Sequence, residues 1–427
     1  MYINTVELTN IRGFTHAKLI FQPGFNLVVG VNGVGKTTIL ESVRVLLSHI
    51  LTEIKSPIIV KDYFSKSDIN INTNSLQLNS SFTVDEQSYE FLYRKSAKDY
   101  TIVQTEQPKR TKASVANIRE EAITLEDRIE FKTPINRFSN DTLLGIFFST
   151  RRSAISRENP KISNYKLPHS VAFVESLSST RSFNVKMFAE WFKVQKALAK
   201  ENSKFDRVIQ LVKQTVYTFL PAFSDLEIQE DEISKELTFH ITKFEKALSF
   251  TQLSDGERGL LALVFDISRR LIIANIDKDN PLEGKAVILI DELDLHLHPR
   301  WQRTVVSDLL RTFPNCQFIA TTHSPQIISS VLPGNIQIIK DFEVDQTVKS
   351  FGLDINWILK FIMEDDDRLA ESVAAIASVQ KLFDNVEFEE ARLLIDSYKL
   401  QNLQLDEWVI FEAKMSHLEM FEDEEDN

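Results

Sequence analysis

Hydrophobic and polar positions along the chain follow patterns that predict alternating strands and helices. Two short, largely apolar runs, 25–29 and 286–290, are typical of strands buried on both faces of a parallel sheet. A helix-like segment, 39–47, follows the first run, and another, 259–273, precedes the second. Short buried strands that alternate with helices predict an α/β fold.

The same patterns divide the chain into four parts. Residues 1–180 read as the first half of the α/β core, followed by a strand-rich lobe, and residues 181–223 read as a short helical insertion of one or two helices. Residues 224–345 complete the core and end in an apolar strand, 336–339. Residues 346–427 are expected to form about three helices and an acidic tail. The tail is expected to be solvated and disordered, and the alternative is an interaction surface for a basic partner.

A glycine-rich loop follows the first apolar run. Residues 30–38 read Gly-Val-Asn-Gly-Val-Gly-Lys-Thr-Thr and match the phosphate-binding pattern G-x-x-x-x-G-K-[ST] in its proper place between a strand and a helix. Backbone N–H groups and the helix N-terminus would face the phosphates, while Lys36 reaches the terminal phosphates and Thr37 can bind Mg²⁺. The predicted nucleotide contacts are Asn32, Gly33, Val34, Gly35, Lys36, Thr37 and Thr38.

Two carboxylates end the second apolar run. Asp291 and Glu292 follow residues 286–290 directly. Together with the phosphate loop they predict a nucleotide-hydrolysing site, in which Asp291 helps to hold Mg²⁺ and Glu292 orients and deprotonates the attacking water.

A second anion-binding feature lies between these motifs. Residues 253–258 read Leu-Ser-Asp-Gly-Glu-Arg and open the predicted helix, so Ser254 and Gly256 would lie at its N-terminus. Because the chain already has a complete phosphate loop, this second site favours the nucleotide of a partner. The segment resembles the signature motif of ABC-type ATPases, in which two heads enclose two ATP molecules in a head-to-head dimer.

Other residues extend that resemblance to the SMC and RecF branch of these ATPases. Asp294 matches the D-loop, His323 matches the switch histidine that senses the γ-phosphate, and Arg12 lies in an opening, 8–14, that is similar to the start of these heads. The resemblance implies an ABC-type ATPase head that uses ATP and Mg²⁺. The glutamine of the Q-loop stays unassigned among Gln77, Gln87, Gln104 and Gln107.

Three features narrow the resemblance further. They are residues 295–299 (Leu-His-Leu-His-Pro), residues 321–326 (Thr-Thr-His-Ser-Pro-Gln) and the C-terminal segments 351–359 and 389–394. Together they look most like the ATPase subunit of Septu-type anti-phage systems, including those attached to retrons. That family implies an ATPase that controls a separate HNH nuclease. Two alternatives remain: a RecF-like DNA-repair clamp, and a toxin-system regulator that acts through ATP binding alone.

Basic residues at two places in the chain are candidates for contact with nucleic acid or phosphate. Five of them recur every three or four residues in the predicted insertion and would share one arc if the helix were continuous. Contact with a nucleic-acid backbone, DNA or RNA, and an ordinary solvated surface are weighed equally. A separate pair, Arg151 and Arg152, follows the apolar stretch 143–148 and favours either phosphate contact or an exposed strand edge. The five insertion residues are Lys193, Lys196, Lys200, Lys204 and Arg207.

Composition favours a cytoplasmic protein. The 427 residues include a single cysteine, Cys316, so no disulfide can form within the chain. No apolar run approaches the ~20 residues of a membrane span. Charge is distributed unevenly. Residues 364–427 hold 19 acidic and 5 basic side chains, whereas residues 1–363 hold 42 acidic and 44 basic ones, and the net charge of the whole chain is -12. The acidity therefore belongs to the C-terminal part.

Overall fold

The computed structural model describes two compact units, residues 1–358 and 359–427. The division falls within helix α7 (Ile355–Phe361), whereas the sequence patterns placed the start of the C-terminal part at residue 346. The residues described are 1–54, 59–98, 124–132, 143–153, 168–230, 237–346, 350–363 and 370–425.

A six-stranded sheet forms the centre of the first unit. Its order is β14-β13-β3-β12-β11-β7, and every neighbouring pair is parallel except β13 and β14. Every residue of β3, β7, β11 and β12 is buried, as the apolar runs 25–29 and 286–290 predict for β3 and β11; β3 and β12 also bury polar residues, among them Asn26 and Gln317. The expected α/β fold is confirmed. The strands are β3 (Phe25–Val29), β7 (Leu144–Phe148), β11 (Ala286–Ile290), β12 (Cys316–Thr322), β13 (Ile336–Lys340) and β14 (Glu343–Gln346).

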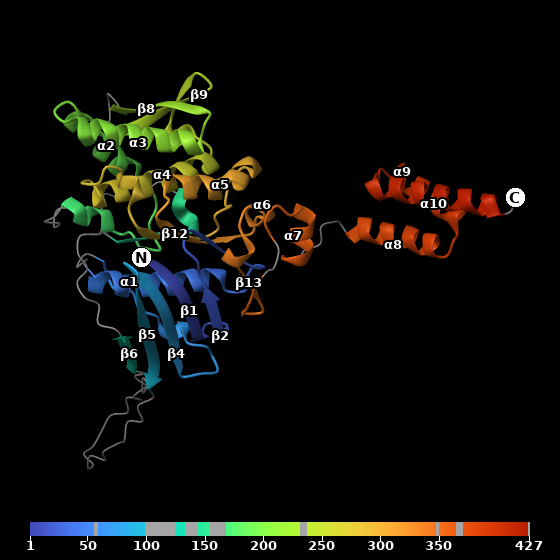
Figure 1. The fold of residues 1–427 in the computed structure, drawn as a ribbon, viewed down its shortest axis with the longest axis horizontal. Helices are drawn as coiled ribbons and strands as arrows, with labels where there is room; N and C mark the ends of the chain where they lie inside the picture. The colour runs from blue at the N-terminus through green and yellow to red at the C-terminus, as the bar shows by residue number, and fades with distance from the viewer. Residues whose placement is uncertain are drawn as a thin grey trace, which may run out of the picture. The chain divides into compact units, whose positions relative to one another are not determined.

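Helix α1 (Lys36–Ile54) and an antiparallel sheet lie on one side of the central sheet (Figure 1). The antiparallel sheet has the order β2-β1-β4-β5-β6. The side chain of Gln317, on β12, donates to the carbonyl of Ile3 and accepts from its N–H, which ties the two sheets together. The five strands are β1 (Tyr2–Ile11), β2 (Phe14–Ile20), β4 (Ser75–Val84), β5 (Gln87–Lys98) and β6 (Thr124–Phe131).

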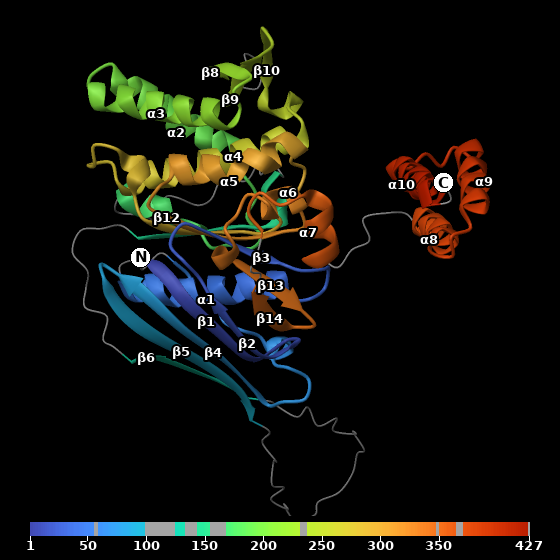
Figure 2. The ribbon, with the colours of Figure 1, turned by 45° about the vertical axis from the view of Figure 1, so that its right-hand side comes forward.

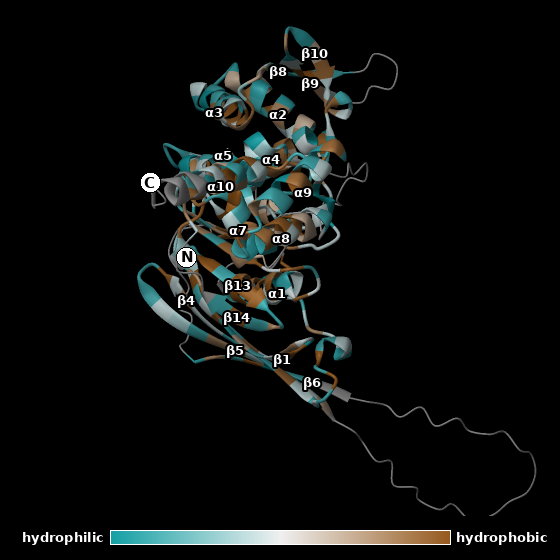
Figure 3. Cartoon of the chain, turned by 90° about the vertical axis from the view of Figure 1, so that its right-hand side faces the viewer, coloured by the Kyte–Doolittle hydropathy of each residue, from teal (hydrophilic) through white to brown (hydrophobic). Residues whose placement is uncertain are grey.

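Helices α4 (Asp255–Ala274) and α5 (Pro299–Thr312) cover the other side, and α2 and α3 lie beyond them (Figures 1 and 2). The expected helical insertion is a pair, α2 (Val185–Ala199) and α3 (Ser203–Phe219). Figure 3 shows that α3 carries both hydrophobic and hydrophilic residues, and its buried residues recur at helical spacing: Val208, Ile209, Val212, Thr215, Val216 and Phe219. A small sheet follows the pair: β8 (Phe223–Glu230), β9 (Leu237–Lys243) and β10 (Lys246–Ser249), in the order β10-β9-β8.

A buried charged cluster joins α4 to the rest of the first unit. Asp266 accepts hydrogen bonds from Arg181 and Arg270, and it also pairs with Arg269. Arg270 additionally donates to the carbonyls of Ala172 and Val174. Burial raises the pKa of the Asp266 carboxyl, but its three arginine partners outweigh burial and hold the pKa well below its usual range. Asp266 is therefore ionised at neutral pH and fixes α4 to its surroundings.

The second unit contains a three-helix core. Helices α8 (Ala370–Asp384), α9 (Phe388–Leu400) and α10 (Asp406–Glu425) bury Val379, Ile395 and Trp408 between them. The expectation of a disordered acidic tail is wrong for most of the run 422–426, because helix α10 continues through Glu425.

None of the helices that the structure describes is long and apolar enough to cross a membrane. Helix α4 is among the longest and is buried almost throughout, but its apolar faces contact protein. The single cysteine, Cys316, is also buried, and burial raises the pKa of its thiol to about 12. The thiol is therefore protonated at neutral pH and unreactive.

Replacing Asp266 by Asn should destabilise the first unit by about 3–5 kcal/mol, because it leaves buried arginines without their counter-charge. Thermal melting of the full chain checks this, with Asp277→Asn as the matched control. Asp277 also pairs with a basic residue, Lys204, but its side chain is 84% exposed. Equal melting temperatures for the two variants would contradict the role given to the cluster.

Candidate nucleotide-binding site

The loop between β3 and α1 has a backbone that only glycine tolerates at two positions. A Cβ on Gly30 would lie 2.4 Å from the carbonyl oxygen of Ile339, and a Cβ on Gly35 would lie 2.5 Å from the ring of Phe14. Both glycines also have positive φ angles, as does Gly33. The loop therefore lies against β13 on one side and against an aromatic ring on the other, with Asn32 and Gly33 exposed and Val34 buried.

Lys36 is buried beneath this loop. Its ammonium group donates to the carbonyls of Gly30 and Val31, at 2.9 and 2.8 Å. Burial lowers the pKa of Lys36, whereas Glu292, Asp291 and Asp294 act in the opposite direction. A lysine held at the mouth of the loop among carboxylates is placed to bind phosphate oxygens.

Thr37 and Asp291, which are 254 positions apart, meet at the carboxyl ends of β3 and β11. The Thr37 hydroxyl lies 3.2 and 3.4 Å from the two carboxylate oxygens of Asp291. Thr321, on the intervening strand β12, donates to the same carboxylate at 2.7 Å. A hydroxyl and a carboxylate at this separation form the oxygen donor set that Mg²⁺ prefers.

Three further predicted residues, Glu292, Asp294 and His323, lie near Thr37 and Asp291. Glu292 has a left-handed backbone (φ 47°), and its N–H donates to the Thr321 hydroxyl at 2.7 Å. Asp294 accepts from the Thr322 hydroxyl and from the N–H of His323, at 2.5 and 3.1 Å. Burial lowers the pKa of His323, as does the neighbouring Lys36, so its imidazole is neutral at pH 7. The structure thus gathers these predicted residues at one edge of the sheet.

Arg12 approaches from the turn between β1 and β2. It donates to the hydroxyl of Thr38 at 3.2 Å and pairs with Glu41 and Asp68. Its side chain is 42% exposed, so the guanidinium flanks α1 at the surface beside the phosphate loop. This position allows contact with a nucleotide bound there.

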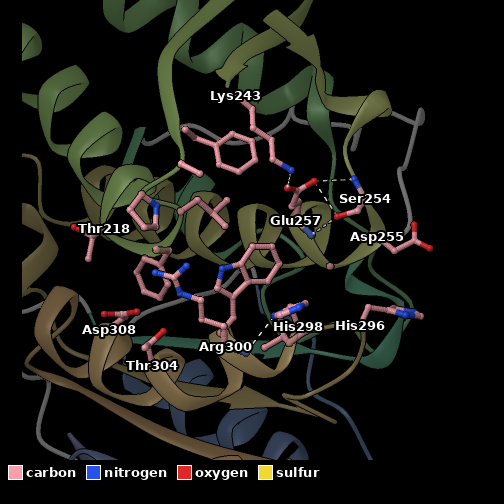
Figure 4. Close-up of a pocket in the computed structure, with 18 of the residues that line it drawn as sticks. Thr218, Lys243, Ser254, Asp255, Glu257, His296, His298, Arg300, Thr304 and Asp308 are labelled. Carbon is pink, nitrogen blue, oxygen red and sulfur yellow. Dashed lines mark hydrogen bonds and ion pairs between the residues drawn. The ribbon is translucent and has the colours of Figure 1, made fainter. Parts of the chain in front are cut away.

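Ser254 and Gly256 lie at the N-terminus of α4. Ser254 accepts from the N–H of Glu257 and donates to its carboxylate, and Glu257 in turn pairs with Lys243 on β9 (Figure 4). A Cβ on Gly256 would lie 2.2 Å from the carbonyl oxygen of His296, so the start of α4 packs against the turn that follows Asp294. The contacts of these two residues are therefore made away from the phosphate loop.

A cavity of about 900 Å³ opens beside Ser254 and Gly256 (Figure 4). Lys243, His296, Arg300 and Trp301 line it, together with the segment that joins α3 to β8. Ser254 and Asp255 are exposed here, as a contact to another molecule requires, whereas Gly256 is buried.

Comparison with known protein families decides the relationship. The sequence model of the family described as "AAA domain, putative AbiEii toxin, Type IV TA system" matches residues 25–329. The chain belongs to this family. The match includes the phosphate loop, Ser254, Asp291 and His323, and membership of an AAA-domain family implies ATP as the nucleotide.

Individual proteins that are similar to this chain over most of its length include ATPases of retron systems and Septu proteins. The retron Ec83 probable ATPase of Escherichia coli is 26% identical, covering 92% of this chain and 82% of its own. Septu protein PtuA of Bacillus thuringiensis is also 26% identical, covering 94% and 93%. The resemblance drawn from the sequence is therefore confirmed. A solved SMC head bound to part of ScpA is 16% identical, with a TM-score of 0.46, covering 82% of this chain and 98% of that one.

The basic residues of the insertion are arranged differently from the single arc expected. Lys193 and Lys196 lie on α2 and Lys204 on α3, so one continuous helical face is wrong. These three also pair with Glu230, Glu227 and Asp277 respectively. The acids come from β8 and from the segment after α4, which the local sequence could not reveal. Contact of these residues, with Lys200 and Arg207, to nucleic acid stays a prediction.

The glutamine of the Q-loop stays unassigned. Gln77 and Gln87 bond to Arg94 and Tyr89, respectively, within the antiparallel sheet. The remaining candidates for the Q-loop, Gln104 and Gln107, lie outside the described residues.

Arg151 is exposed, whereas Arg152 is buried behind Asp291. Sequence alone could not separate the two arginines, because adjacent residues of the same type carry no signal of which one is buried.

Replacing Gly30 by Ala should weaken ATP binding by at least about tenfold, because the new methyl group collides with a backbone carbonyl and displaces the loop. Titration with a fluorescent ATP analogue measures the effect. Gly334→Ala is the matched control, since nothing lies within 4 Å of the position of its Cβ. Unchanged affinity in Gly30→Ala would show that the loop does not hold the nucleotide.

Proposed function

We propose that this protein binds and hydrolyses ATP between two copies of the chain, and that its nucleotide state controls a partner HNH nuclease in anti-phage defence. The observation that carries the hydrolytic part is the convergence of Lys36, Thr37, Asp291 and Glu292 at one edge of the sheet. The names of the retron and Septu relatives support the assignment to defence.

The separation of the two anion sites supports a dimer. Lys36 and Thr37 occupy the carboxyl ends of the parallel strands, whereas Ser254 and Gly256 make their contacts within α4 and against His296. A helix N-terminus that is open to the outside can approach the nucleotide of a second copy. Two chains related by a two-fold axis would then complete two sites, because each supplies both surfaces.

Each residue of the site has its own role in ATP hydrolysis. Lys36 neutralises charge on the transferred phosphate, and Thr37 and Asp291 would hold Mg²⁺, which neutralises charge that develops during transfer. The Glu292 carboxylate follows the end of β11, where it can accept a proton from water in line with the phosphate. His323 is neutral and can donate a hydrogen bond from one ring nitrogen while accepting at the other.

Replacing Glu292 by Gln should trap an ATP-bound dimer and lower kcat by about 10²–10⁴, because the amide cannot accept the proton. Light scattering on a sizing column with saturating ATP and Mg²⁺ measures the dimer, and phosphate release measures turnover. Glu53→Gln, an exposed acid on α1, is the control and should behave like the unaltered chain. A monomeric Glu292→Gln chain at saturating ATP would contradict the two-copy site.

The nuclease partner is tested by purifying the tagged chain from its native host. An HNH nuclease should co-purify in a fixed ratio and be identified by mass spectrometry, and Glu292→Gln should change the nuclease activity of that complex. Recovery of DNA-repair factors in its place would contradict the defence assignment and favour the clamp.

A further inference from the structure

The turn that carries the catalytic carboxylates is held from two sides. On the N–H side, Thr321 accepts from Glu292 through its hydroxyl and from Leu293 through its carbonyl, at 2.7 and 2.8 Å. The carbonyls of Asp291, Glu292 and Leu293 face the other side of the turn. Glu292 has a left-handed backbone here, a conformation that non-glycine residues adopt only when their surroundings impose it.

Arg152 occupies that other side. It lies in a short 3-10 helix, η2 (Thr150–Ser153), just after β7, whose last residue pairs with the last residue of β11. Its guanidinium donates to the carbonyl of Asp291 at 2.7 Å and to that of Glu292 at 2.6 Å. A third hydrogen bond reaches the carbonyl of Leu293 at 3.2 Å.

The chemistry of this contact requires arginine. Three successive carbonyls along a turn need donors spread over several ångströms, which a planar guanidinium provides and a single ammonium group does not. Arg152 is only 6% exposed, and burial lowers its pKa to about 10, with Asp294, Asp291 and Glu292 acting in the opposite direction. The side chain is therefore still cationic at neutral pH, directly behind three carboxylates.

We propose that Arg152 is a positioning residue for ATP hydrolysis, which fixes the backbone of residues 291–293 so that the Glu292 carboxylate stays aligned with the attacking water. It touches neither the nucleotide nor the water. Phosphate binding depends on Lys36 and the loop at 30–35, whose contacts with β13 and Phe14 do not involve Arg152. This inference rests on the proposed ATPase activity.

The test separates binding from turnover. Arg152→Lys and Arg152→Ala should each lower kcat by about 100-fold, since a shift of ~1 Å at the catalytic group suffices for that loss. The dissociation constant for a fluorescent ATP analogue should change by less than about threefold. Arg151→Ala, the exposed neighbour in the same short helix, is the matched control and should leave both values unchanged.

Chemical rescue distinguishes positioning from a loss of folding. Guanidinium ion, added far below the concentration that unfolds the chain, should restore part of the turnover of Arg152→Ala but none of that of Glu292→Gln. Turnover of Arg152→Lys equal to that of the unaltered chain, or a fall in turnover matched by loss of ATP binding without rescue, would overturn the role of Arg152 alone. Absence of ATP hydrolysis by the unaltered chain would overturn both this role and the proposed function.

Discussion

Parallel pairing of β3, β12 and β11 is the constraint on which the candidate site depends. Because the strands run in the same direction, their carboxyl ends meet at one edge of the sheet. That edge brings Thr37, Asp291 and His323 together although they come from distant parts of the sequence. β12 has a particular part in this arrangement, since Thr321 bonds to both Asp291 and Glu292.

Charge at this edge is balanced by groups that come from other elements. Asp291, Glu292 and Asp294 lie near Lys36 in front and Arg152 behind, and each cation has a pKa lowered chiefly by burial. Buried charges persist only when such partners surround them. The Asp266 cluster applies the same principle to α4, the helix whose N-terminus carries Ser254 and Gly256. Both candidate anion-binding surfaces therefore rest on buried ionic contacts within one unit.

Much of this could be predicted from sequence because the signals are local. The uninterrupted apolar run of β11 indicated a buried strand, and the glycine spacing before Lys36 indicated a phosphate loop. Long-range contacts were beyond such reasoning. Nothing near Lys193 or Lys204 reveals that Glu230 and Asp277 lie opposite them, and nothing near Arg152 shows which backbone it supports. The continuation of α10 through its acidic end was missed because charge runs are usually solvated.

The central claim, that one active site is built from two chains, is tested most directly by mixing two inactive variants. Lys36→Ala removes the phosphate contact, and Ser254→Arg obstructs the N-terminus of α4 while leaving the phosphate loop intact. Each variant alone should hydrolyse no ATP. Their mixture should recover turnover, because a mixed dimer contains one site with an intact phosphate loop from one chain and an intact Ser254 from the other. A mixture that stays inactive, although both variants fold and Ser254→Arg binds ATP, would contradict the account.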